Sequence, residues 1–244
     1  MSTSDISLLR KDENYYGETG RKYLSNSDIR SLLKDPRSFR QQQPKTSALV
    51  EGSYLHTAIL EPHKLGKFLI VDSSTRTTKL YKEAIESSGE EVLLLKHEQE
   101  ELDKMVDAIK GNLDWYSMIY AEGALYEEPG IGQIKSTLWK GKADVLTSNC
   151  IIDIKTTSNI DDFKWSARKY NYDSQAWIYN QIFGKGLVFL AIEKKTCRMG
   201  VFECSDEFLE YGKEKVMKAI DVYNKFYGPN PTESIDQYYT KETL

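Results

Sequence analysis

The sequence predicts a mixed α/β fold in which a central mixed sheet is flanked by helices and preceded by a helical N-terminal part. Three observations support this prediction. The first 115 or so residues carry mostly helical patterns, short segments rich in β-forming residues follow up to residue 155, and two strand-like segments then alternate with helical ones up to residue 226. Strands and helices mixed in this order are typical of a layered α/β fold.

The N-terminal half is predicted to be helical after a loosely ordered segment over residues 1–22. Ser25 stands three residues before Asp28, as in a capping box, so a helix is expected to begin there and to be broken or restarted at Asp35-Pro36. The further elements expected in this half are helices over residues 47–61, 78–87 and 97–110, with a short buried strand at 91–95.

The C-terminal half is predicted to begin with an antiparallel meander of four short strands, because turn residues separate its β-rich segments. These strands are expected at 119–126, 131–138, 142–147 and 150–155, with turns at 128–130, 140–141 and 148–149. Then come helices at 161–168 and 172–183, strands at 186–194 and 198–204, a helix at 206–226 and an irregular tail after residue 229.

The composition, 40% hydrophobic and 29% charged, is that of a globular protein. No apolar run approaches the roughly 20 residues that span a bilayer, and the N-terminus lacks a signal-like apolar segment. We therefore expect a cytoplasmic location and no membrane partner. The three cysteines are few and odd in number, which favours reduced thiols.

The net charge of −4 argues at first against a nucleic-acid partner, but the charges are unevenly distributed. Residues 1–50 carry nine Lys and Arg against six Asp and Glu, and residues 131–200 carry eleven against six. A phosphate backbone responds to the electrostatic field of the nearby surface rather than to the net charge of the chain. The two basic stretches therefore leave nucleic-acid binding open. Ordinary solvated surface charges are the alternative interpretation.

The informative polar residues are Asp144 in one predicted strand and Asp153 and Lys155 in the next. Side chains two apart on a strand point to the same face, so Asp153 and Lys155 project together, and a tight turn brings Asp144 beside them. Mg²⁺ is commonly held by one or two carboxylates plus substrate phosphate. A nearby lysine stabilises charge that develops on the phosphate. The set is therefore a candidate for metal-dependent phosphodiester hydrolysis.

A structural interpretation of the same residues stays open, because a D-x-K pattern occurs often by chance and could form an ion pair on a half-exposed strand. Residues 151–155, Ile-Ile-Asp-Ile-Lys, nevertheless place two charges within an apolar strand, where each must lose hydration at a cost. The next helical segment favours the functional interpretation, since Gln175 and Tyr179 stand four residues apart on one helix face.

Together these residues resemble the PD-(D/E)XK nuclease superfamily, and within it the group with a Gln-x-x-x-Tyr helix. The N-terminal half narrows the resemblance: Gly52, His56 and Leu60-Glu61-Pro62 are similar to the G-x-x-x-H-x-x-x-L-E-P helix of the RecE (exonuclease VIII)-like phage recombination exonucleases. The resemblance covers about residues 23–195. The individual motifs are short, and their order and combination make the match specific.

The resemblance implies a metal site and a catalytic lysine. His56 would be a metal ligand delivered from the N-terminal helix. Asp144 and Asp153 would be the metal-bridging carboxylates, with the backbone carbonyl of Ile154 as a further ligand. Lys155 would be the catalytic lysine. For His56, a packed or surface histidine is the alternative interpretation.

Other residues are implied as supports or substrate contacts. Gln175 and Tyr179 would position the DNA backbone or support the lysine, although Tyr179 could equally be structural. Glu122 stands where the family often has a glutamate and is a candidate for supporting the metal ligands. Arg168 is a candidate phosphate contact or a solvated charge. Ala143 stands where the superfamily name has proline, a position that is widely replaced.

The resemblance implies a Mg²⁺-dependent exodeoxyribonuclease, with Mn²⁺ as a substitute, that degrades linear double-stranded DNA from its ends. The polarity would be 5′ to 3′, and the single-stranded tails would serve recombination with a single-strand annealing protein. The resemblance also implies a homo-oligomeric ring around DNA and, for a phage-encoded chain, the host cytoplasm.

Two alternatives stay open: an endonuclease or repair nuclease of the same superfamily with another DNA substrate, and a catalytically inactive DNA-binding module. An iron–sulfur version would need four cysteines and the chain has three. We expect a single nuclease domain over residues 1–244, divided into a loose segment 1–22, a mostly helical part 23–115, a catalytic core 116–228 and a tail 229–244.

Overall fold

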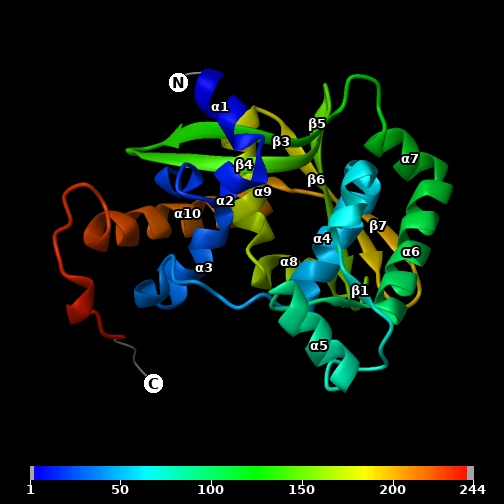
Figure 1. Ribbon diagram of the computed structural model, residues 1–244. Helices are drawn as coiled ribbons and strands as arrows, with labels where there is room; N and C mark the ends of the chain where they lie inside the picture. Colours follow the sequence, from blue (N-terminus) through cyan, green and yellow to red (C-terminus); the bar gives the residue numbers. More distant parts are fainter. Residues whose placement is uncertain (1–2, 241–244) are drawn as a thin grey trace.

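The computed structural model, which describes residues 3–240, has a five-stranded mixed sheet with helices on both of its faces (Figure 1). The sheet order is that of the chain: β3 (Leu125–Ile134), β4 (Thr137–Leu146), β5 (Cys150–Thr157), β6 (Gly186–Glu193) and β7 (Met199–Glu203). The pair β5 and β6 is parallel, and the other three pairs are antiparallel. The predicted fold class is confirmed.

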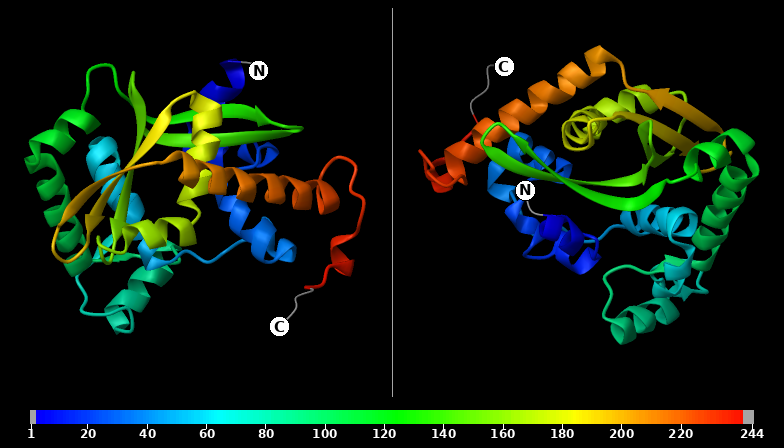
Figure 2. Two further views of the ribbon diagram at one scale, coloured as in Figure 1. Left: turned by 180° about the vertical axis from the view of Figure 1, so that it is seen from behind. Right: turned by 90° about the horizontal axis from the view of Figure 1, so that it is seen from above.

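Two apolar cores lie on the two faces of this sheet, because successive strand residues point to opposite sides. Ile151 belongs to one core and Ile152 to the other. The first core is covered by α3 (Asn26–Lys34), α8 (Phe163–Lys169), α9 (Tyr172–Phe183) and α10 (Asp206–Phe226). The second is covered by α4 (Ser47–Leu60), α6 (Lys96–Gly111) and α7 (Leu113–Ile119), and Figure 2 shows the helices on either side of the sheet.

Residues 3–22 are more ordered than predicted. It contains α1 (Thr3–Leu9), α2 (Asp12–Tyr16) and a 3₁₀ turn over Gly20–Lys22. Leu9, Tyr15 and Tyr23 are buried there against Ile131 of β3, which explains the order. Such short helices carry too few periodic positions to be detected in the sequence.

The predicted four-stranded meander is wrong: residues 119–146 form only the two long strands β3 and β4. The expected turn residues Pro129, Gly130 and Gly141 lie inside these strands. Pro129 is tolerated because β3 is an edge strand. The glycines allow α9 to approach, since a Cβ on Gly130 would lie 2.5 Å from Ile182, and one on Gly141 would lie 2.7 Å from the Tyr179 ring.

The remaining helices begin and end close to the predicted positions. The Ser25 and Asp28 side chains form the expected capping box of α3, and the helix ends at Lys34, just before Pro36. The strand expected at 91–95 shortens to two residues. The other small elements are β1 (Ile70–Val71), which pairs in parallel with β2 (Leu94–Leu95), α5 (Lys79–Ser88), and 3₁₀ turns over Pro36–Ser38, Pro62–Lys67 and Ile235–Gln237.

Among residues 3–240, none of the helices combines the length and the apolar character that crossing a membrane requires.

We predict that Gly212→Ala destabilises the protein, because α10 packs directly on the first turn of α9 there. An added Cβ would lie 2.1 Å from the Asp173 carbonyl oxygen, and backbone cannot move aside cheaply. Overpacking of this kind costs about 1–3 kcal/mol, more than the gain in helix propensity of about 1 kcal/mol from Gly to Ala. Denaturant unfolding measures the difference. The control is Gly111→Ala at the end of α6, where no atom lies within 4 Å of the added Cβ. Equal stabilities of the two variants would contradict the prediction.

Candidate metal centre

The candidate site begins at a fork between β4 and β5. These strands pair only at Val145 with Ile152 and at Leu146 with Ile151, and they diverge beyond that point. There the Asp144 carboxylate takes the place of a strand partner: its Oδ2 accepts a hydrogen bond from the Ile154 N–H at 2.8 Å. The fork therefore holds a buried carboxylate between two strands.

Asp153 and Lys155 project from the same face of β5, as the sequence predicts. The Asp153 side chain is only 2% exposed and forms an ion pair with the Lys155 ammonium group through Oδ2. Its other oxygen, Oδ1, accepts a hydrogen bond from Gln175 Nε2 of α9 at 2.5 Å. Both oxygens of Asp153 are thus engaged, and the structure brings all three residues together.

His56 reaches the fork from α4, which covers the opposite face of the sheet. Its Nε2 lies 2.8 Å from the Ile154 carbonyl oxygen, and its Nδ1 lies 3.3 Å from Asp144 Oδ2. A carbonyl oxygen only accepts, so Nε2 carries the hydrogen and donates it. Nδ1 then faces a carboxylate, an arrangement that needs either a second proton on the ring or a cation beside both groups.

Glu127 completes the site and was missed in the sequence. It lies on β3 between Tyr126 and Glu128, whose register with β4 places it opposite Asp144, and its φ of +49° is unusual for a strand. Glu127, Asp144 and His56 offer ligand atoms that all lie within 4.8 Å of one another. A correct β3–β4 register would have revealed this pair, but the turn predicted at 128–130 concealed it.

Two predicted residues are not brought to this site. Glu122 is exposed in the turn between α7 and β3 and is absent from the lining of the cavity, because the strand that should have carried it begins only at residue 125. Arg168 lies at the end of α8, where its guanidinium group approaches Glu207 at 3.4 Å and covers the Tyr211 ring of α10.

Tyr179 lies in the wall of the site and fastens α9 to β4. Its hydroxyl donates to the Lys142 carbonyl oxygen at 2.9 Å and accepts from the Lys142 N–H at 3.2 Å.

The site is a cavity of about 390 Å³ whose lining includes His56, Glu127, Asp144, Asp153, Lys155, Gln175 and Tyr179.

Burial and mutual charge shift the pKa values in this cavity. Burial alone would lower the pKa of His56, but the charge and hydrogen bond of Asp144 outweigh burial and raise it to about 9. Burial raises the pKa of Glu127 to about 7, helped by the charge of Asp144. The pKa of Asp144 is lowered, because His56 and Lys155 outweigh its burial. Burial raises the pKa of Asp153 despite the charge of Lys155.

The donor set fits a hard divalent cation. Glu127 and Asp144 offer carboxylate oxygens, which Mg²⁺ and Mn²⁺ prefer, and imidazole is a common further ligand of transition metals. The hydrogen bond from Nε2 to a backbone carbonyl is the arrangement that orients a metal-ligating histidine through its other nitrogen. The cavity thus has the chemistry of a metal centre on one side and a paired lysine on the other.

A mixed sheet with carboxylates and a lysine at the fork of two central strands defines a PD-(D/E)XK-type fold. Residues 22–231 match the family described as PDDEXK-like domain of unknown function (DUF3799), and the chain belongs to that family. The predicted superfamily is confirmed, whereas the finer resemblance to RecE-like exonucleases stays a prediction.

A solved structure agrees with this fold. A protein from Eubacterium rectale, described as a "putative exonuclease", aligns over 96% of this chain and 95% of its own with a TM-score of 0.65 and 20% identity. A second solved structure covers 69% of this chain and 86% of its own at 16% identity, with a TM-score of 0.30, which is too low to indicate the same fold. No curated protein matches the sequence.

We predict that in EDTA the protein loses stability as the pH rises from about 5 to about 9. When the pKa of a group is higher in the folded protein than in the unfolded chain, its contribution to stability is fully present below the unfolded pKa. That contribution is lost as the pH rises above the folded pKa. For Glu127 this window runs from 4.5 to about 7, and for His56 from 6.5 to about 9. Each group contributes a slope of at most about 1.4 kcal/mol per pH unit.

Denaturant unfolding across this pH range in EDTA measures the effect. Glu127→Gln should flatten the lower part of the curve, and His56→Asn the upper part. Asp161→Asn is the control, because Asp161 is an exposed carboxylate that lies outside the cavity. Identical pH profiles for all four proteins would contradict the assignment of these pKa values.

Proposed function

We propose that the protein is a metal-dependent exodeoxyribonuclease that hydrolyses linear double-stranded DNA from its ends. One observation carries the proposal: His56, Glu127 and Asp144 converge within 4.8 Å in a cavity that also holds the Lys155 and Asp153 ion pair. Carboxylates beside a lysine are the groups that phosphodiester hydrolysis with Mg²⁺ requires, and Mn²⁺ would substitute.

Within this proposal, Glu127, Asp144 and His56 Nδ1 would hold the cation. A bound divalent cation polarises a phosphodiester and lowers the pKa of a bound water molecule toward neutral pH. Asp153 would be a further ligand, as the family resemblance implies. The Ile154 carbonyl oxygen, which the same resemblance implies, would not join them while it accepts from His56 Nε2, because the two nitrogens of the ring point away from each other. Asp153 would become available when the Lys155 ammonium group turns toward the substrate.

Lys155 would act on the phosphate itself. Asp153 and Asp144 raise its pKa above the ordinary lysine value even though burial opposes this, so the ammonium group stays charged. A charged donor fixed beside the phosphate stabilises the negative charge that grows in the transition state. Gln175 would hold Asp153 in place through its 2.5 Å hydrogen bond, which makes it a positioning residue.

Action at DNA ends, 5′ to 3′ polarity and a role in recombination come from the resemblance to RecE-like exonucleases. The same resemblance supports a ring-shaped homo-oligomer, an annealing partner and the cytoplasm of a host cell. An endonuclease or repair nuclease remains the second candidate, because the same cavity would serve either. The presence of all the ligands and of the lysine argues against an inactive DNA-binding module.

A cleavage assay separates these functions. The purified protein is incubated with end-labelled linear duplex, covalently closed circle and single strand, with and without Mg²⁺. We expect metal-dependent degradation of the linear duplex and an intact circle. Cutting of the circle would identify an endonuclease, and no hydrolysis with Mg²⁺ or Mn²⁺ would contradict both enzymatic functions.

Two variants test the site. Asp153→Ala and Lys155→Ala should each lower the cleavage rate by at least about 10²-fold, the typical loss when one stabilising group is removed from a transition state. The Lys155→Ala variant should still bind Mn²⁺, because the carboxylates that would hold the cation are unchanged. Matched controls are Asp161→Ala and Lys164→Ala, whose side chains lie outside the cavity. Circular dichroism checks the fold, and undiminished cleavage by either folded site variant would show that the site is misplaced.

A further inference from the structure

We propose that a second groove, beside the metal cavity, binds the single-stranded part of the DNA substrate. This groove has a volume of about 1490 Å³, larger than the roughly 300–1,000 Å³ of a small-molecule pocket. Tyr16, Ser25, Ser27 and Lys140 line both the groove and the metal cavity, so the two are continuous. The proposal rests on the proposed function and adds where one DNA strand lies.

The charge of the groove fits a polyanion although the whole chain is acidic. Its lining contains three aspartates, no glutamate, and six cations: Arg21, Arg30, Lys34, Arg40, Lys140 and Lys194. These residues come from the two stretches, 1–50 and 131–200, that have an excess of Lys and Arg. A strip of cations can follow a phosphate backbone and exchange its counterions.

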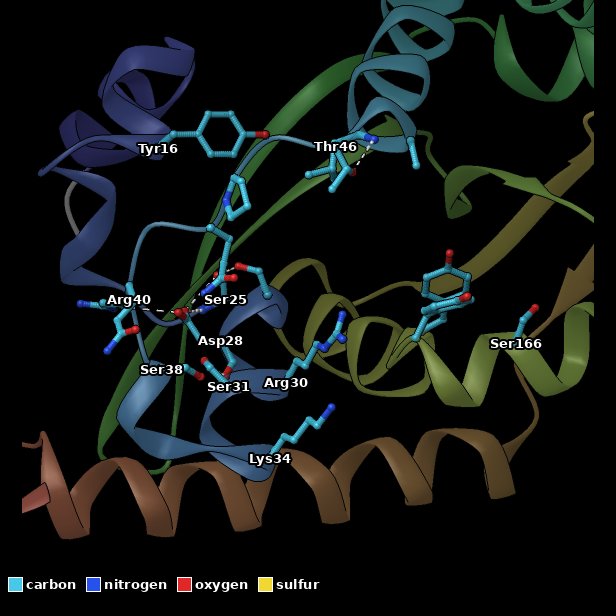
Figure 3. Close-up of a pocket in the computed structure, with 18 of the residues that line it drawn as sticks. Tyr16, Ser25, Asp28, Arg30, Ser31, Lys34, Ser38, Arg40, Thr46 and Ser166 are labelled. Atoms are coloured by element: carbon cyan, nitrogen blue, oxygen red, sulfur yellow. Dashed lines mark hydrogen bonds and ion pairs between the residues drawn. The ribbon is translucent and has the colours of Figure 1, made fainter. Parts of the chain in front are cut away.

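The best placed cations of the groove lie on α3. Arg30 and Lys34 are exposed, and within the described part of the chain neither makes an ion pair or a hydrogen bond. Figure 3 shows both side chains extending from α3 in the direction of α8, where Ser166 lies. By contrast, the groove carboxylate Asp28 already binds the N–H and hydroxyl of Ser25. The local positive charge is therefore available to a ligand.

Aromatic rings make the groove suited to unpaired bases. The rings of Tyr170 and Tyr16 are 55% and 70% exposed and line the groove, and base stacking on such rings is tolerant of sequence. Tyr172, which also lines it, lies next to the catalytic lysine, because Lys155 Nζ is 4.9 Å from its ring centroid. The Tyr170 ring centroid lies 6.1 Å from that of Tyr172, so a base on Tyr170 would lie near the phosphate presented to Lys155.

The depth of the metal cavity favours a single strand over a duplex. Asp153 and Lys155 are only 2% and 18% exposed, so the scissile phosphate must leave the duplex surface to reach them. Duplex DNA is stiff, with a persistence length of about 150 base pairs, whereas a single strand bends at each nucleotide. The groove would hold the strand that has already been separated from its partner.

The test is binding of a fluorescent oligo-dT strand in EDTA, followed by anisotropy at several salt concentrations. Arg30→Ala/Lys34→Ala should reduce the slope of log affinity against log salt by about 1.4, at about 0.7 for each phosphate contact. The same slope predicts a loss of roughly tenfold in affinity near 0.15 M salt. Tyr170→Ala should weaken binding without changing the slope, and Tyr170→Phe should restore it.

The control is Lys82→Ala/Lys104→Ala, which removes the same charge from exposed sites that line neither the groove nor the cavity. Unchanged affinity in the α3 variant, or the same loss in the control, would overturn the proposal. A loss of affinity in the α3 variant that is seen with a blunt duplex probe but not with the single strand would also overturn it. The binding assay does not depend on cleavage, so it tests the groove separately from the nuclease activity. The α3 variant could bind normally in a protein that cleaves DNA, which would refute only the groove. The wild type could also bind single strands without cleaving DNA, which would refute only the nuclease activity.

Discussion

The site depends on the backbone of one residue, Ile154, at the point where β4 leaves β5. Its N–H donates to Asp144 Oδ2, and its carbonyl oxygen accepts from His56 Nε2. In a strand both groups of one residue face the same neighbour, so these two side chains supply the hydrogen bonds that a paired strand would have made. A carboxylate from the sheet and an imidazole from α4 are fixed beside each other without an unsatisfied peptide.

The cost of this arrangement is a concentration of buried charge, and the surrounding fold offsets it. Removing one partner from a buried ion pair leaves an uncompensated charge, so Asp153 needs both Lys155 and Gln175. Gln175 is in reach because α9 lies close to the sheet, over Gly130 and Gly141. Tyr179 fixes the same helix through the Lys142 backbone. Gly130 of β3 and Gly141 of β4 thus let α9 approach closely enough for Gln175 to reach Asp153 of β5.

Local patterns in the sequence predicted much of the fold and several of the residues that line the candidate metal cavity. Capping and periodicity placed most helices, and the two-residue spacing on β5 placed Asp153 and Lys155 on one face. The β3–β4 hairpin was not predictable in this way, because Pro129 and Gly141 have the composition of turns and are explained only by an edge position and a packed helix. That single error hid the position of Glu127 opposite Asp144.

His56, Glu127 and Asp144 would form a divalent metal centre, in which all three offer a ligand atom to one cation. The decisive experiment is a crystal structure of the protein soaked in Mn²⁺, with diffraction data collected for the anomalous signal of manganese. We expect an anomalous peak within bonding distance of His56 Nδ1 and of both carboxylates, and no such peak in Asp144→Asn. A peak elsewhere, or none in this cavity, would contradict the account.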